Sequence, residues 1–310
     1  MSRLWQTHAL MLLTTALVST SFTVGKAIAD GMDPAVLTLL RFALAALLFL
    51  PFIAWKYGLH LPNRKQFFGY ACISFTLTGF FWLMFLSLQS TTALNTGVIY
   101  TLVPGLSSLY SAVLLRERLG RYRLLALLPA TLGAIWVLFH GSWAQLLAFD
   151  LHSGDLIFFF SCLLMAFYTP LIKLFHHEEA MSVMTFWILV TGCAWLLLFS
   201  GQQLTVVPWR EVPLQVWLGI VYLAVFSTMI TFFLSQLCTL RLGPTRVMAY
   251  SYLYPPCIML IEWGYGQSLP PAQVLPGVGL IIAAMLIVQQ GAEDSIPCSE
   301  KNIERCRQKT

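Results

Sequence analysis

The sequence is dominated by apolar stretches of about bilayer length, joined by short polar linkers. A helix needs about 20 apolar residues to cross the hydrocarbon core of a membrane. Because that core offers no water to the backbone, each such stretch has to form an α-helix. We therefore predict an all-α membrane protein with ten transmembrane helices, at residues 8–28, 34–55, 67–88, 92–115, 123–139, 154–174, 181–200, 214–237, 244–264 and 272–290.

The composition agrees with this class. Of the 310 residues, 58% are hydrophobic and only 10% are charged, whereas soluble domains carry about 25% charged residues. The mean hydropathy is +0.76. The net charge of +5 comes from basic residues confined to a few linkers, as topology signals are. We expect the lipid bilayer as the surroundings of the chain and no nucleic acid as a partner.

Sequence signatures of an enzyme or a metal site are absent. Five of the seven cysteines fall inside apolar runs, and there is no Cys-x-x-Cys pair, so neither a disulfide framework nor a zinc site is expected. The chain has no His-Glu-x-x-His, no Gly-x-Ser-x-Gly and no phosphate-binding loop. We predict no catalytic residues, no metal and no cofactor, and any active transport has to draw on a gradient.

Basic residues alternate between the two sides of the predicted membrane. One set of linkers and both termini contain Arg3, Lys56, Arg64, Lys65, Arg116, Arg118, Arg121, Arg123, Lys173, Arg241, Arg246, Lys301, Arg305, Arg307 and Lys309. The other set contains only Arg210, with Lys26 close to it. Since lysine and arginine mark the cytoplasmic side, both termini are predicted to be cytoplasmic. Short loops and this asymmetry suit a bacterial inner membrane.

Two halves of the chain resemble each other. Residues 21–26 of the first span are similar to residues 167–173 of the sixth, and Pro104 matches Pro255 at an offset of about 150 residues. We predict two five-helix repeats, at residues 1–145 and 146–291. An odd number of spans per repeat inverts the second one, as in many secondary transporters. The polar tail at residues 292–310 is expected to be disordered and cytoplasmic.

Several short motifs resemble those of one family. The chain is similar to the drug/metabolite transporter superfamily, in its EamA-type branch with ten spans, over residues 8–290. The matching residues are Phe22 and Lys26, Arg41-Phe42, Pro104 followed by Glu117-Arg118-Leu119, Gly154-Asp155, and Tyr168-Thr169. The resemblance implies export of small metabolites or drugs, with substrates that differ widely between members.

The chain departs from this family pattern at four places. Val18 and Met165 stand where the family has tryptophan, and Arg116 replaces the usual glycine before Glu117. Gln267-Ser268 stands where a glutamate is expected. These departures concern the substrate more than the fold.

Three ionisable residues lie within apolar spans: Lys26, Arg41 and Glu262. Such a charge is costly in a membrane, so it usually faces a cavity or a partner. Counting along the helices places all three toward the outer side, which predicts a charged layer where Glu262 offsets Lys26 or Arg41. Two alternatives are that Lys26 and Arg41 snorkel to the interface and that Glu262 belongs to a structural ion pair. Glu262 is our candidate for a protonatable coupling group.

A set of aromatic residues provides candidates for the cavity wall. It comprises Tyr100, Tyr168, Tyr250, Tyr252 and Tyr254, with Trp82 and the amide of Asn95. Tyr250 and Tyr254 are four residues apart and are expected to share a helix face. The alternative is an interfacial aromatic belt. Pro104 and Pro255 are the predicted hinges, because a proline inside a helix removes a backbone hydrogen bond.

Together these features predict a secondary transporter that exports a small metabolite, either an amino acid or a drug-like solute, by alternating access. Protons are the coupling ion in this hypothesis, through Glu262. The alternative is a translocator of lipids or lipid precursors on the same scaffold. The sequence makes no prediction of the oligomeric state.

Overall fold

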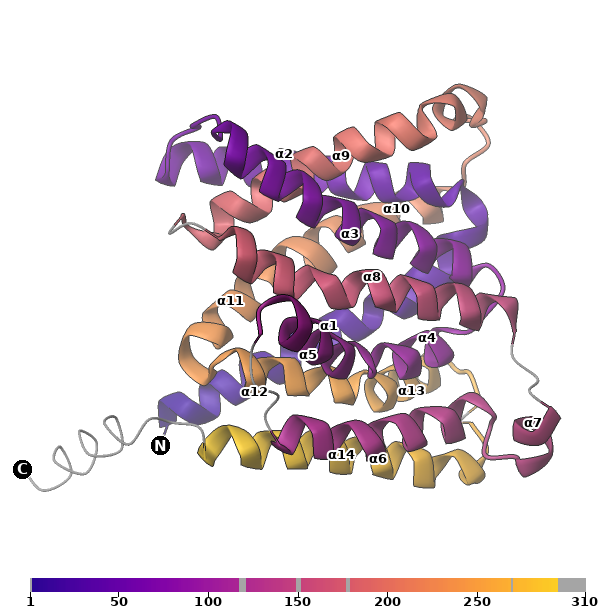
Figure 1. The fold of residues 1–310 in the computed structure, drawn as a ribbon. Coiled ribbons are helices and arrows are strands. Elements are labelled where there is room, and N and C mark those ends of the chain that lie inside the picture. Colours follow the sequence, from indigo (N-terminus) through magenta and orange to yellow (C-terminus); the bar gives the residue numbers. More distant parts are fainter. Residues whose placement is uncertain (1, 117–120, 149–151, 177–178, 269, 295–310) are drawn as a thin grey trace, which may run out of the picture.

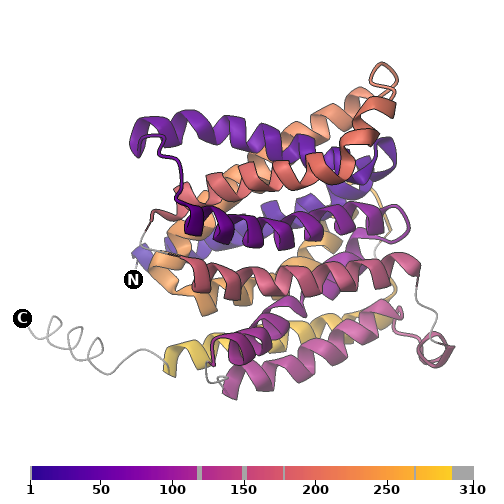
Figure 2. The ribbon, with the colours of Figure 1, turned by 45° about the horizontal axis from the view of Figure 1, so that its top comes forward.

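The computed structural model describes residues 2–116, 121–148, 152–176, 179–268 and 270–294. Within these ranges the chain forms helices, turns and loops, and no β-strand. The long helices lie roughly parallel or antiparallel to one another in a stack (Figures 1 and 2). The helical segments are α1 Ser2–Ile28, η1 Ala29–Gly31, α2 Pro34–Lys56, α3 Arg64–Leu88, α4 Ala93–Tyr100, α5 Val103–Leu114, α6 Arg121–Leu138, α7 Trp143–Ala148, α8 Ser153–Phe175, α9 Met181–Val206, α10 Leu214–Ala224, η2 Val225–Ile230, α11 Thr231–Leu242, α12 Pro244–Ala249, η3 Tyr250–Leu253, α13 Tyr254–Gly264, η4 Ala272–Val274 and α14 Leu275–Asp294.

Every predicted span coincides with a helix or a broken helix. Eight helical segments in the described ranges are long and apolar enough to cross a membrane. The fifth predicted span is α6, whose apolar part Leu125–Leu138 is shorter. The ninth is divided into α12, η3 and α13. The protein is therefore an all-helical membrane protein, as predicted.

Both predicted proline positions coincide with a break in a span. Between α4 and α5, the amides of Thr101 and Leu102 donate to carbonyls three residues back, each at 3.1 Å. Pro104 then occupies the first turn of α5, and Pro255 occupies the first turn of α13 after the 3-10 turn η3. Proline is tolerated in a first turn because its missing N–H has no partner there in any case.

The helices of the two halves pack in matching pairs. In the first half, α1 packs on α11 and α13 of the second half. In the second half, α8 packs on α3 and α5 of the first. The equivalent helices α2 and α9 pack on each other, as do α6 and α14. Exchanging the halves therefore reproduces the pattern of contacts, which is the arrangement expected of two repeats.

Backbone contact is closest where α6 meets α14. A Cβ atom added to Gly133 would lie 2.5 Å from the carbonyl oxygen of Gly277. Buried alanines of α6, among them Ala126, Ala130 and Ala134, surround this contact. Small residues of this kind let membrane helices approach closely. These two helices form the edge of the stack that lies lowest in Figure 1.

The first helix begins and the last helix ends at the same end of the bundle, and α7 lies at the opposite end (Figure 1). This arrangement agrees with an even number of crossings. Which end faces the cytoplasm is still a prediction from the basic residues. The predicted tail, residues 292–310, is helical up to Asp294, and the rest of it lies outside the described residues, as does the motif Glu117-Arg118-Leu119.

Arg116 adopts a left-handed backbone conformation just after the end of α5, with φ of 54°. A glycine takes this conformation without steric cost, whereas a residue with a Cβ atom does not. This explains why glycine suits that position in the family that the sequence resembles.

Candidate substrate site

Aromatic rings from both halves meet at the centre of the bundle. The ring centroid of Tyr254 lies 5.4 Å from that of Tyr100 and 6.1 Å from that of Phe22. Phe158 and Phe80 close the cluster, with centroids 6.2 Å from Phe22 and 5.7 Å from Tyr100, respectively. Two of the seven predicted cavity residues, Tyr100 and Tyr254, are thus brought together. They come from the two broken spans, next to the breaks.

A polar pocket lies about one helical turn from this cluster. Lys26 follows Phe22 by four residues on α1, Asp155 precedes Phe158 by three on α8, and Asn95 precedes Tyr100 on α4. These separations correspond to about 5–8 Å along a helix. The pocket has a volume of about 240 Å³ and is lined by Lys26, Gln89, Ser90, Thr91, Thr92, Asn95, His140 and His152.

A buried carboxylate lies directly behind the pocket wall. Asp155 is 3% exposed and accepts hydrogen bonds from the Thr91 hydroxyl and from Asn95 Nδ2, the latter at 3.2 Å. Its other oxygen lies 3.8 Å from Nδ1 of His152. Asp155 is in the first turn of α8, where the helix dipole favours a negative charge.

Asp155 joins the two halves, because Thr91 and Asn95 belong to the first half and α8 to the second. Our sequence analysis named this residue only as part of a family motif. An acidic residue at the start of an apolar span was the signal that could have identified it as a site residue.

Lys26 is the basic group of the pocket. Its Nζ donates to the carbonyl oxygen of Leu88 at 2.6 Å. Beside it, Gln89 Nε2 donates to the carbonyl oxygen of Ala29 at 3.0 Å. Both bonds join the end of α1 to the end of α3. No ion pair within 4.0 Å connects Lys26 to Asp155 in the described part of the chain; Lys26 lines the pocket, whereas Asp155 lies behind Thr91 and Asn95 of its wall.

The amide oxygen of Asn95 has no hydrogen-bond partner. Asn95 is 2% exposed, and its Oδ1 is buried without a donor, while its Nδ2 bonds both oxygens of Asp155. A buried acceptor without a donor costs about 1–3 kcal/mol. Asn95 also lines the pocket, but Oδ1 itself is buried, so the side chain has to turn before a solute can donate to this oxygen.

Arg41 is not part of this pocket. It is 1% exposed, and its Nε donates to the Thr228 hydroxyl at 3.0 Å. Its guanidinium carbon lies 4.3 Å from the centroid of the Phe81 ring, a cation–π contact. Its Nη2 donates to the carbonyl oxygen of Ser227 at 3.4 Å, and its Nη1 has no hydrogen-bond partner. Thr228 belongs to the π-helical turn η2, and such turns often mark functional sites or points of strain.

The predicted pairing of Glu262 with Lys26 or Arg41 is not formed. Glu262 is partly exposed on α13, and no ion pair within 4.0 Å joins it to either residue where the chain is described. The physical reason is the direction in which each basic side chain points. Lys26 reaches the end of α3, and Arg41 reaches η2. Lys26 and Arg41 therefore have separate partners, and the predicted ion pair with Glu262 is absent among the described residues.

The remaining predicted residues are spread over the molecule. The Tyr250 hydroxyl bonds Nδ1 of His8 at 2.5 Å. Tyr250 and Tyr254 belong to different clusters, contrary to expectation, because the 3-10 turn η3 between them has fewer residues per turn than an α-helix. Tyr168 packs among side chains of α3, α8 and α9, and Trp82 is exposed and stacked on Phe199.

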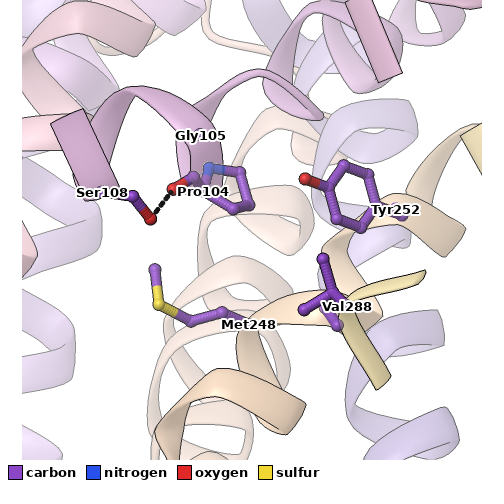
Figure 3. Close-up of a pocket in the computed structure, with 7 residues that line it drawn as sticks. Pro104, Gly105, Ser108, Met248, Tyr252 and Val288 are labelled. Atoms are coloured by element: carbon purple, nitrogen blue, oxygen red, sulfur yellow. Dashed lines mark hydrogen bonds between the residues drawn. The ribbon is translucent and has the colours of Figure 1, made fainter. Parts of the chain in front are cut away.

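Tyr252 faces the other break across a narrow crevice. Figure 3 shows its ring opposite Pro104, with Met248 and Val288 beside them. The crevice has a volume of only about 30 Å³, which is too small for a metabolite. The two predicted hinge regions are therefore in close proximity, α5 on one side and η3 on the other.

Comparison with known proteins identifies the family. The pattern of the EamA-like transporter family matches residues 5–139 and 152–289, which is most of the chain in two copies. The chain belongs to this family. The protein is thus a membrane transporter with two EamA domains and not an enzyme.

Two relatives from Bacillus subtilis (strain 168) are similar to this chain. The uncharacterized transporter YyaM is 23% identical over 86% of this chain and 88% of its own length. The uncharacterized transporter YetK is 26% identical over 71% of this chain and 67% of its own length. The fold is also similar to that of another protein, known from a crystal structure. The superposition covers 93% of this chain and 98% of the other chain, with a TM-score of 0.65 and 18% sequence identity. This last likeness concerns the fold alone.

Proposed function

We propose that this EamA-family protein is a secondary transporter that exports a small metabolite by alternating access. The observation that favours this function is the polar pocket, because both halves contribute to it. Lys26 and Asn95 come from the first half, and His152 and the underlying Asp155 come from the second. A site between two repeats changes shape when one repeat moves against the other.

In this proposal, the two broken spans, α4–α5 and α12–η3–α13, are the helices that move. Each break lies next to a tyrosine of the central aromatic cluster, Tyr100 before Pro104 and Tyr254 before Pro255. A rotation at either break would shift one of these rings relative to Phe22. We propose residues 1–145 and 146–291 as the two repeat units, with Pro104 and Pro255 as hinges.

We infer an outward-facing pocket and a gradient as the energy source. If both termini are cytoplasmic, the polar pocket opens toward the outside, because α7 and the pocket loops lie at the end opposite the start of α1. The chain has no nucleotide-binding loop, so the transport draws on a gradient. We keep Glu262 as the proposed proton-coupling group, since it is a partly buried carboxylate within a span.

The size of the pocket favours a small solute. Drug-sized ligands usually occupy about 300–1,000 Å³, and the polar pocket has about 240 Å³. Between the two substrate classes that the sequence predicts, an amino acid fits this volume better than a drug-like solute.

A lipid translocator is the second candidate function. It is favoured by an apolar groove of about 310 Å³ on the side of the bundle, between α2 and the η2–α11 segment. Its lining residues are Leu48, Phe49, Phe52, Met229, Ile230, Phe233 and Leu234. A groove of this composition accommodates an acyl chain but offers no group to a polar solute.

Counterflow in proteoliposomes tests the two functions against each other. Vesicles loaded with a mixture of amino acids and common metabolites are diluted into labelled solutes, and exchange is followed by mass spectrometry. We expect one class of water-soluble solute to exchange, with none exchanging in protein-free vesicles. The export proposal fails if no soluble solute exchanges while the protein is monodisperse and labelled lipids move between the leaflets.

A further inference from the structure

We propose that the polar pocket is a binding site for a zwitterion, the main-chain group of an α-amino acid. Lys26 binds the carboxylate of the solute, and the ammonium group lies between Asp155 and the amide oxygen of Asn95. This inference rests on the proposed transport function and names the substrate class for its site. It follows from three observations: Lys26 at the pocket and Asp155 behind its wall are not paired with each other, Asn95 Oδ1 has no donor, and buried aromatic rings lie about one turn below.

Asp155 and Asn95, which would bind the ammonium group of the solute, have oxygen lone pairs that accept no hydrogen bond among the described residues. A carboxylate has about four lone-pair positions, and Asp155 receives hydrogen bonds only from Thr91 and Asn95 in the described part of the chain. Asn95 Oδ1 receives none. An ammonium group has three N–H donors and no acceptor. It can therefore bond both oxygens at once, and it satisfies the orphaned amide oxygen.

Lys26 would bind the carboxylate group of the solute. Its ammonium group is bonded to the carbonyl oxygen of Leu88 at 2.6 Å. That bond fixes the side chain at the pocket wall and leaves donor capacity, because a lysine ammonium has three N–H groups. Hydrogen bonds between ionised groups are roughly twice as strong as those between neutral groups. A solute carboxylate is therefore a strong acceptor for Lys26.

The separation of the two charges selects for a solute with both. If Lys26 and Asp155 were paired, a solute would have to break that ion pair; no such pair within 4.0 Å occurs among the described residues. A simple amine would leave Lys26 without a counter-ion, and a simple carboxylate would be repelled by Asp155. A zwitterion complements both groups and leaves the charge of the site unchanged.

The solute side chain would extend toward the central aromatic cluster. Phe22 and Phe158 lie about one turn below Lys26 and Asp155 on the same helices, and Tyr100 lies below Asn95. The rings of Phe22 and Phe158 are buried in the core, so a solute side chain that reaches them meets apolar surroundings. The pocket itself, at about 240 Å³, limits the size of the solute. Leucine is therefore a suitable probe.

The test uses three ligands that differ only in charge: leucine, 3-methylbutan-1-amine, which lacks the carboxylate, and 4-methylpentanoate, which lacks the ammonium group. Their affinities for the purified full-length protein in detergent are measured from ligand-dependent shifts of the melting temperature. We expect leucine to bind at least tenfold more tightly than either analogue.

Two variants then show which residue binds which charged group of leucine. In Lys26→Gln, leucine should bind no better than the amine, and in Asp155→Asn it should bind no better than the carboxylate. Glu211→Gln removes an exposed charge in the loop between α9 and α10 and should leave all three affinities unchanged. If these residues serve only folding, the variants should bind all three ligands with equally reduced affinity. That result would overturn the proposal.

The affinities of the wild-type protein test the proposal without any variant. If leucine binds no more tightly than both analogues, the zwitterion site is refuted. Exchange of another class of solute in the counterflow experiment would then leave the transport function intact, so the two failures are distinguishable.

Discussion

Two almost completely buried charges lie in this membrane protein, and their surroundings differ. Asp155 is 3% exposed and lies behind a polar pocket, with hydroxyl and amide partners from the other half. Arg41 is 1% exposed and is covered by the ring of Phe81, with Thr228 of η2 as its main partner.

The comparison shows that burial of a charge does not by itself indicate a binding site. Both residues obey the rule that an ionisable group in a membrane needs partners. Only Asp155 adjoins a pocket that also contains an unsatisfied acceptor and an opposite charge. The hydrogen bond from Arg41 joins α2 to η2, whereas in our proposal Asp155 binds the solute. The following predictions test this division.

The largest effect is expected for Arg41→Ala. The substitution removes a desolvated cation–π contact and a charged hydrogen bond, so the free energy of unfolding should fall by about 3 kcal/mol. Denaturation in mixed detergent micelles measures it, with Lys65→Ala in an exposed position as the matched control. An Arg41→Ala protein that is as stable as wild type but no longer binds leucine would reverse the roles given to Arg41 and Asp155.

Asp155→Asn should affect transport more than stability. The asparagine retains the shape of the side chain and one acceptor oxygen, which can keep the bonds from Thr91 and Asn95 to Oδ1, but it removes the charge that binds the ammonium group. We expect leucine counterflow to fall at least tenfold, which is about 1.4 kcal/mol, with a melting temperature close to that of wild type. Asp30→Asn, in an exposed position, is the control. A large loss of stability with normal counterflow would mean that Asp155 is structural.

Thr228→Val tests the polar partner of Arg41. The valine has nearly the same shape but cannot accept the hydrogen bond from Nε, and the expected loss is about 1 kcal/mol of unfolding free energy. Thr239→Val is the control, because the Thr239 hydroxyl donates to a carbonyl oxygen of its own helix, as the Thr228 hydroxyl also does to the carbonyl oxygen of Leu223. Equal losses in the two variants would show that the Thr228 hydroxyl contributes nothing specific to Arg41.

The smallest effect on stability and binding is expected for Glu262→Gln. Glu262 is partly exposed and outside the pocket, so both quantities should remain near the wild-type values. If Glu262 is the coupling group, the variant loses the pH dependence of transport, measured as solute flux over a series of imposed pH gradients. An unchanged pH dependence would remove Glu262 from the mechanism.

The sequence predicted the scaffold well because bilayer thickness fixes the length and polarity of a span. All ten spans were located, and both breaks were found from Pro104 and Pro255. The site was predicted less well. Counting residues gives the depth of a side chain but not the direction in which its helix faces, so Lys26, Arg41 and Glu262 were assigned to one layer although they have different neighbours.

The two tyrosines of the broken ninth span show the same limit. Tyr250 and Tyr254 would share a face in a regular α-helix, but the 3-10 turn η3 directs them to His8 and to the central cluster, respectively. Asn95 was named together with the aromatic candidates, whereas its partner Asp155 was named only as part of a family motif. Their contact depends on the packing of α4 against α8, which only the three-dimensional structure contains.

The proposed transport mechanism depends most on a pocket that opens to the outside between the two halves. Cysteine labelling in whole cells tests it, in a protein whose native cysteines are replaced. Ser90→Cys lies at the pocket and Leu59→Cys in the loop between α2 and α3. We predict that a membrane-impermeant maleimide labels Ser90→Cys from outside, that leucine slows this labelling, and that Leu59→Cys reacts only after permeabilisation. Labelling of Leu59→Cys from outside, with Ser90→Cys protected, would contradict the account.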